Sequence, residues 1–172
     1  MPGVEIGITN VHLDLGAGRR GTDMGPSAMH VAGLVPALQR LGHQVVDVRT
    51  IGSVTREASS VGDARARFLD VVRDVCRELA DHVQATVDAG RLPLVLGGDH
   101  SQAMGTISGL VRHHRRRGKD VAVIWVDAHT DMNTPESSPT GNIHGMPCAV
   151  VLGRGAPELV CMGDRVPMVD AK

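Results

Sequence analysis

The stretch Gly90–Ser101, which reads GRLPLVLGGDHS, decides the fold. Its apolar run Leu92–Leu96 is too short for a helix and is bounded by glycines, so it predicts a strand buried on both faces. An amphipathic helix is expected before it, from about Asp63 to Ala89, and another after it, from Ser101 to about Arg116. A buried strand between two helices is typical of a parallel α/β sheet.

The same alternation of strands and helices extends outward in both directions along the chain. Three more apolar runs predict strands at Val4–Val11, Val45–Ile51 and Val121–Val126. Between the first two, Pro26 supplies a residue favoured at helix starts, and the helix is expected to reach toward Arg40. We therefore expect an α/β fold with helices on the faces of a parallel sheet.

The amino-acid composition and net charge limit the class of protein and the class of binding partner that we expect. The 172 residues are 42% hydrophobic and 22% charged, which is typical of one globular domain rather than a disordered chain. A net charge of -1 gives no general reason to bind nucleic acid or anionic lipid, so small molecules are favoured as ligands. No apolar window approaches the roughly 18 residues that span a bilayer, and no secretory signal is evident. We expect a cytoplasmic protein without a membrane partner.

The three cysteines, Cys76, Cys148 and Cys161, are widely spaced and form no C-x-x-C pair. Neither a disulfide framework nor a thiolate zinc site is indicated, so reduced thiols without a special role are expected.

Metal-ligand residues follow two of the predicted strands. In open parallel sheets, ligands bind beyond the carboxyl ends of the strands. His100 follows one strand, and the pattern D-x-H-x-D at Asp127, His129 and Asp131 follows another. If the chain stays extended past Val126, those last three side chains point to the same side. Carboxylates and imidazole suit Mn²⁺, although ligand type leaves Zn²⁺, Fe²⁺ and Co²⁺ open. Loop acids and histidines bonded to backbone are the alternative.

A polar loop continues the chain from Asn133 to Pro147 and reads NTPESSPTGNIHGMP. It is dense in hydroxyl and amide groups and ends near His144. Such a loop can supply the several fixed hydrogen bonds that a charged metabolite needs, although an ordinary surface turn is the alternative.

Two other patterns suggest different functions and carry less weight. Gly16–Gly21 matches G-x-G-x-x-G after a strand, but residues 22–26 are expected to continue as loop rather than open a helix, which argues against dinucleotide binding. The basic run Arg112–Lys119 could contact nucleic acid. It falls at a predicted helix carboxyl end, where cations complement the helix dipole, so a solvated helix end is favoured.

Taken together, the motifs Gly97–Ser101, Asp127–Asp131 and Asn133–Pro147 resemble the ureohydrolases, and the arginase family in particular. The segment Asp23–Ala28, DMGPSA, also matches the bacterial arginase pattern. Agmatinases share the two metal motifs, so the preference for arginase rests on the G-N-x-H-G loop. The resemblance spans nearly the whole chain and implies a three-layer α/β fold with a mostly parallel sheet.

The resemblance also implies an activity, which is hydrolysis of L-arginine to L-ornithine and urea at a pair of Mn²⁺ ions, as part of arginine metabolism and the urea cycle. It implies that His144 shuttles protons and that the chain forms homo-oligomers, trimers or hexamers. The metal ligands would be His100, Asp127, His129 and Asp131, with Asp127 bridging both ions, and the substrate carboxylate would be held by Asn133, Ser138 and Thr140.

One departure from the family pattern is large. The family's later D-x-D-x-x-D-P segment and its glutamate near the carboxyl terminus, which complete the metal and guanidinium sites, have no counterpart in these 172 residues. The resemblance therefore implies that residues 1–172 form the amino-terminal part of one arginase-like domain, and that the sheet has a gap between its third and fourth strands. A shortened ureohydrolase with weak metal binding and little catalysis is the alternative function.

Overall fold

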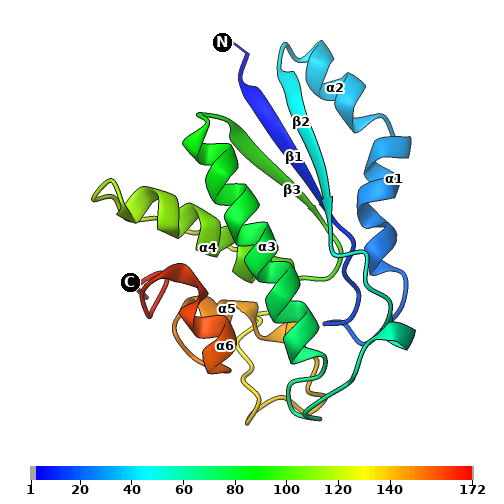
Figure 1. Cartoon of the computed structure of the whole chain (residues 1–172), viewed down its shortest axis with the longest axis vertical. Helices are drawn as coiled ribbons and strands as arrows, with labels where there is room; N and C mark the ends of the chain where they lie inside the picture. The colour runs from blue at the N-terminus through cyan, green and yellow to red at the C-terminus, as the bar shows by residue number, and fades with distance from the viewer. Residues whose placement is uncertain (1–2, 172) are drawn as a thin grey trace.

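A parallel sheet lies at the centre of the computed structural model, which describes residues 3–171 (Figure 1). Its strands are β1 (Glu5–Val11), β2 (Gln44–Ile51) and β3 (Leu92–Gly97), in the order β2-β1-β3. All of β1 after Glu5 is buried, because this strand has a partner on each side and helices over both faces. Three of the four expected strands are thereby confirmed.

Helices flank both faces of this sheet (Figure 1). On one face, α1 (Gly25–Val31) and α2 (Leu34–Arg40) cover a small core formed by Ile6, Ile8 and Leu96. On the other face, α3 (Leu69–Asp88) lies against the strands, and α4 (Gln102–Arg115) packs along α3. The observed layers are helix, sheet and helix, as expected for this fold class.

Two of the expected helices have different limits in the structure. The segment from Pro26 to Arg40 is broken at Gly33, whose φ of 85° is left-handed and ends one helix before the next begins. The long helix begins at Leu69 rather than near Asp63, because Phe68 has a φ of 59° and its N–H donates to the Val61 carbonyl. The spacing of apolar residues along the sequence cannot reveal the break at Gly33 or the later start of the long helix.

The fourth predicted strand, Val121–Val126, is not a strand in the structure, and this expectation is wrong. Its odd-numbered residues pack against the main core, whereas Ile124 and Val126 are 91% and 92% exposed. The alternation of an extended chain is therefore retained. A strand also needs a neighbouring backbone with which to form a ladder, and among residues 3–171 none pairs with this segment.

The expectation that Leu92–Leu96 is buried on both faces is also wrong. Only Leu96 is buried, and Leu92 is 55% exposed. The physical reason is that β3 pairs with β1 alone and forms an edge of the sheet. The apolar run Leu92–Leu96 predicts the strand correctly. Its composition is typical of a strand covered on both faces, which β3 is not in this structure.

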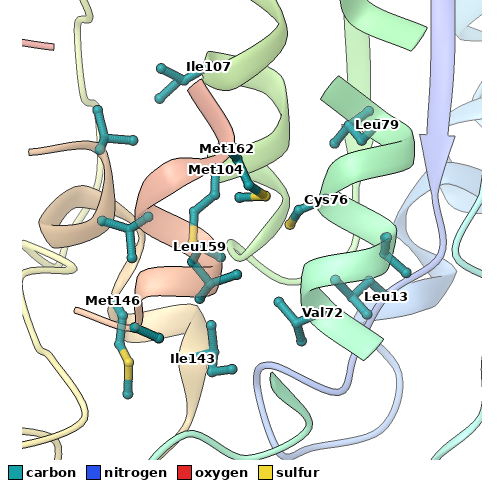
Figure 2. Close-up of a cluster of buried hydrophobic side chains, with 14 of the residues drawn as sticks. Leu13, Val72, Cys76, Leu79, Met104, Ile107, Ile143, Met146, Leu159 and Met162 are labelled. Carbon is teal, nitrogen blue, oxygen red and sulfur yellow. The ribbon is translucent and has the colours of Figure 1, made fainter. Parts of the chain in front are cut away.

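The main core joins α3 and α4 to the last third of the chain (Figure 2). Val72, Cys76 and Leu79 of α3 belong to this cluster together with Met104 and Ile107 of α4. The carboxyl-terminal segment adds Ile143, Met146, Leu159 and Met162 from its short helices. These helices are η3 (Ile143–Gly145), α5 (Pro147–Val151), α6 (Pro157–Val160) and η4 (Cys161–Gly163). Aliphatic and methionine side chains fill this core, because the sequence has only one Phe and one Trp.

The basic run at the end of α4 makes internal contacts instead of pointing only into solvent. The Arg112 guanidinium donates to the Met162 carbonyl and to Asp81, and Arg115 donates to the carbonyls of Gly163 and Met168. These bonds attach the carboxyl-terminal segment to α4. The run therefore has a structural role, and the expectation of a merely solvated helix end needs this correction.

The two remaining short elements are η1 (Thr22–Met24) and η2 (Arg56–Ala58). Because α1 begins only at Gly25, no α-helix opens at Gly21, and the glycine motif lacks the helix start that dinucleotide phosphates need. Cys76, Cys148 and Cys161 are free thiols. Within residues 3–171, no helix combines the length and apolarity that crossing a membrane requires.

Candidate metal and substrate site

Three of the four predicted metal ligands lie together at the carboxyl end of β3. The Nδ1 atom of His100 lies 2.8 Å from Asp127 Oδ2 and 2.7 Å from Asp131 Oδ2. One ligand atom from each of the three residues lies within 4.8 Å of the other two. Because His100 follows β3 and Asp127 follows the extended segment Val121–Val126, two distant parts of the sequence form this cluster.

The cluster fits a divalent cation. Asp131 Oδ2 is buried and accepts no hydrogen bond, even though it lies so close to the His100 ring. A buried carboxylate oxygen without a donor is unfavourable unless a cation compensates its charge. One imidazole and two carboxylates form a donor set that hard and borderline metal ions accept.

The fourth predicted ligand, His129, lies beside the cluster but outside it. Its side chain is 84% exposed, and its Nδ1 atom is 3.6 Å from Asp127 Oδ1. The expected extended course past Val126 is wrong, because the Asp127 carboxylate accepts the His129 backbone N–H at 2.8 Å and the chain bends. The same hydrogen bond is the main reason that the pKa of Asp127 lies below its usual value. Asp131 then takes a left-handed φ of 49°.

His100 is held by a buried neighbour whose role the sequence did not reveal. Asp99 is 3% exposed, and its carboxylate accepts the backbone N–H groups of Ser101 at 2.9 Å and Ala17 at 3.1 Å. Burial raises the pKa of Asp99, and these hydrogen bonds oppose that shift. The Trp125 ring lies 4.7 Å from the His100 ring. The Asp99 bonds hold the backbone around His100, and the Trp125 ring packs near the imidazole.

All eight predicted site residues line a single hollow of about 550 Å³. It places His100, which comes from a separate part of the sequence, around one space with Asp127–Asp131 and the polar loop that follows them. From the metal-binding motifs come His100, Asp127, His129 and Asp131, and from the polar loop come Asn133, Ser138, Thr140 and His144.

The polar loop presents hydrogen-bond donors to this hollow. Ser138 Oγ accepts the Gly141 N–H, and Thr140 Oγ1 accepts the Asn142 N–H. Asn133 Oδ1 accepts the Ser137 hydroxyl. In the described part of the chain, the two hydroxyl protons and the Asn133 amide group have no acceptor of their own. Three donors that converge on one space are suited to binding an anionic group.

A second polar residue that sequence reasoning missed holds this loop in place. Asn142 Nδ2 donates to the Ala17 carbonyl at 3.1 Å, and the His144 backbone N–H donates to the Gly16 carbonyl at 3.2 Å. The glycine-rich loop after β1 thus connects to both the metal cluster, through Asp99, and the polar loop, through Asn142. Its glycines contribute to the site by this connection, not by binding phosphate.

Comparison with known proteins agrees with this geometry. The model of the family described as Arginase matches residues 4–169. The chain belongs to the arginase family. The arginase of Bacillus caldovelox is 48% identical over 166 residues, which are 95% of this chain and 54% of that protein. The arginase of Brevibacillus brevis is 45% identical over 97% of this chain and 54% of its own length.

Solved arginase structures share the fold. A crystal structure of the Bacillus cereus arginase matches with a TM-score of 0.86 and 44% identity, covering 96% of this chain and 54% of that one. This arginase-family chain therefore spans about half the length of the relatives it matches. The three-layer α/β fold expected from the sequence is confirmed over that half.

Proposed function

We propose that this chain supplies the metal-binding cluster and the substrate loop of a manganese-dependent hydrolase that converts L-arginine to L-ornithine and urea. The observation that carries the proposal is the convergence of His100, Asp127 and Asp131 in the hollow that the polar loop also lines. Membership of the arginase family supports the same reaction. In this proposal, residues 1–172 form the amino-terminal part of one arginase-like domain.

The proposed metal ligands are His100, Asp127 and Asp131, with His129 as the fourth. His129 Nδ1 lies 3.6 Å from Asp127 Oδ1 and His129 lines the same hollow, which supports its inclusion. Bound Mn²⁺ ions supply electrostatic stabilisation of negative charge and lower the pKa of water in the site. Asp127 is the proposed bridging carboxylate.

The polar loop would orient the substrate. In this arrangement Asn133, Ser138 and Thr140 donate hydrogen bonds to the amino-acid carboxylate, which places the guanidinium end toward the metal cluster. His144 would carry protons between the hollow and bulk solvent, which is a role that a positioned imidazole can fill as a general acid or base. Its ring is half-buried at the edge of the hollow, where it can contact both.

The biological setting belongs to the same proposal. We infer that the protein takes part in arginine metabolism of the urea-cycle type. From its resemblance to the arginase family we also infer that it is cytoplasmic and forms a homo-oligomer.

The substrate assignment can be tested by comparing ligands with and without a carboxylate. Calorimetric titration of the manganese-loaded chain should show tighter binding of L-ornithine than of putrescine, which lacks the carboxylate. Replacing Ser138→Ala should weaken L-ornithine binding by about tenfold, since a hydrogen bond to a charged group contributes roughly 1.5 kcal/mol or more. Ser60→Ala, an exposed serine in another loop, is the control. Equal binding of both ligands would count against arginine and toward an agmatine-type substrate.

A second candidate function is a ureohydrolase polypeptide that, as residues 1–172 alone, binds metal weakly and turns over little substrate. It is favoured by a metal cluster of three ligand residues in the described part of the chain. A urea-release assay with added Mn²⁺ tests this candidate. We expect little urea from residues 1–172 alone, because a paired metal site needs more carboxylates than this cluster offers, and robust turnover would contradict it.

A further inference from the structure

The indole ring of Trp125 lies beside one of the proposed metal ligands. Its centroid is 4.7 Å from the centroid of the His100 imidazole, and the two ring planes are inclined by 32°. This separation falls within the range of favourable aromatic pairs, whose centroids lie about 4.5–7 Å apart. Trp125 is therefore part of the surroundings of the metal cluster, although no motif of the sequence indicated such a role.

The backbone of His100 is well held, but its ring has few polar contacts. The His100 carbonyl accepts the Ala103 N–H at 3.0 Å, and the Asp99 carboxylate bonds to neighbouring backbone. The ring atom Nδ1 faces the carboxylates of Asp127 and Asp131. Within residues 3–171, the other ring nitrogen, Nε2, makes no hydrogen bond. A metal-binding histidine is normally oriented by a hydrogen bond from its second nitrogen, so packing has to orient this ring.

The Trp125 side chain is placed by packing and not by hydrogen bonds. It packs against the main core from the same side of the extended segment as Val123. Its Nε1 atom is buried and has no partner among the described residues. A buried N–H without an acceptor is unfavourable, and an aliphatic side chain would pack here without that cost. What the indole provides in addition is an aromatic ring beside His100.

An aromatic neighbour acts on a metal-binding imidazole in two ways. It limits the rotation of the ring, so that less side-chain entropy is lost when a cation binds. The imidazole also becomes electron-poor when it donates its lone pair to a cation, and an indole attracts positive charge within about 6 Å more strongly than a phenyl ring does. An aliphatic side chain offers no such attraction.

We propose that Trp125 is a positioning residue for the metal site, which holds the His100 imidazole toward Asp127 and Asp131 and thereby raises the affinity for Mn²⁺. This inference rests on the proposed function, since it requires His100 to bind metal. Trp125 itself is not a ligand, and its effect passes through His100. The loss of metal affinity should therefore be larger for Trp125→Leu than for Trp125→Phe.

Equilibrium dialysis against MnCl₂ measures this effect. Trp125→Leu should bind Mn²⁺ about tenfold more weakly than the wild-type chain, as is typical when a group that orients a ligand is lost. Trp125→Phe, which keeps an aromatic ring, should stay within about threefold of the wild type. The matched control is Val123→Ala, since Val123 packs against the same core from the same segment. This control should lower the free energy of unfolding and leave Mn²⁺ affinity unchanged.

Equal Mn²⁺ affinity of Trp125→Leu and the wild type would overturn the inference. Equal losses in Trp125→Leu and Trp125→Phe would also overturn it, as would equal losses in Trp125→Leu and Val123→Ala, because an aromatic neighbour would then not determine the affinity. Absence of manganese binding by the wild type would overturn the proposed function and this inference with it. The two failures are therefore distinguishable.

Intrinsic fluorescence gives a second measurement that does not depend on how any variant folds. The chain has one tryptophan and no tyrosine, so tryptophan emission reports on Trp125 alone. Mn²⁺ is paramagnetic and quenches the emission of a nearby indole. Titration of the wild type with MnCl₂ should give a saturable loss of emission, with the dissociation constant found by dialysis, and excess EDTA should restore it. Unchanged emission while dialysis shows bound manganese would place Trp125 away from the metal and overturn the inference.

Discussion

Asp99 shows how much of the site depends on a residue outside the cluster of His100, Asp127 and Asp131. Its buried carboxylate accepts backbone N–H groups from Ser101, at the start of α4, and from Ala17, in the loop after β1. It thereby holds three segments together next to His100. The sequence motif shows that Asp99 precedes His100. It cannot show that Asp99 accepts a hydrogen bond from Ala17, 82 residues away, because only the fold brings these two residues together.

Removal of this carboxylate should destabilise the chain. Asp99→Ala leaves two N–H groups without their acceptor at a buried position, and each such group costs about 1–3 kcal/mol. We expect a lower free energy of unfolding in urea, and weaker manganese binding because His100 loses its support. Asp120→Ala, at an exposed position, is the control. Equal stability of both variants would show that Asp99 is not a structural link.

His82 on α3 provides a pH-dependent test that is remote from the metal cluster. Its Nε2 atom is buried without a hydrogen-bond partner, and burial lowers the pKa of its ring. Nearby Asp47 opposes this shift, and Arg49 adds to it. Because the folded pKa lies below the unfolded value near 6.5, the unfolded state binds the proton more readily. The stability of the fold should therefore fall as the pH is lowered from about 6.5 through the folded pKa.

Chemical unfolding between pH 7.5 and pH 5 measures this effect. The free energy of unfolding should fall less steeply in His82→Gln than in the wild-type chain, because the substituted side chain does not titrate. Parallel pH profiles of the two proteins would contradict the assignment of this dependence to His82.

At the scale of elements, the pairing of α3 and α4 is the tightest contact between helices. A Cβ atom added at Gly109 would lie 2.5 Å from the Ala80 carbonyl oxygen, and one at Gly105 would lie 2.5 Å from the Cys76 carbonyl oxygen. These glycines let the two helix backbones approach each other. The sequence predicted both helices from their apolar periodicity, but it gave no sign of how closely they pack.

Gly109→Ala should therefore destabilise the fold, even though alanine is the better helix former. The higher helix propensity of alanine would stabilise the fold by about 1 kcal/mol. Overpacking the contact between α3 and α4 would destabilise it by typically about 1–3 kcal/mol, which is the larger effect. Thermal unfolding should show a lower Tm for Gly109→Ala. Arg77→Ala, at an exposed position of α3, should leave the Tm nearly unchanged. A raised Tm for Gly109→Ala would mean that the helices separate readily.

The elements also show which parts of the fold sequence can predict. β1, β2 and β3 and the helices α3 and α4 follow from local apolar patterns, because each pattern is satisfied by nearby packing. Val121–Val126 has the same kind of pattern, yet it forms no strand without a backbone neighbour. The break at Gly33 is likewise invisible in apolar spacing, since glycine is tolerated within many helices.

At the scale of the whole molecule, side-chain hydrogen bonds tie remote segments of the chain to one another. The loop after β1 contacts Asp99 and Asn142, and the carboxyl-terminal segment is attached to α4 through Arg112 and Arg115. Sequence motifs predicted the ligand types and their common edge of the sheet. They did not predict that His129 would turn outward, because this depends on the local bend at Asp127.

The central claim is that His100 and Asp127, from separate parts of the sequence, bind one metal ion together. Equilibrium dialysis against MnCl₂, followed by metal analysis, tests it with the wild-type chain and the double variant His100→Ala/Asp127→Ala. A matched control, His114→Ala/Asp120→Ala, removes the same residue types at the far end of α4 and just beyond it. We predict that the wild type and the control retain Mn²⁺ and that the double variant binds it at least about tenfold more weakly. Equal manganese content in all three proteins would contradict the claim.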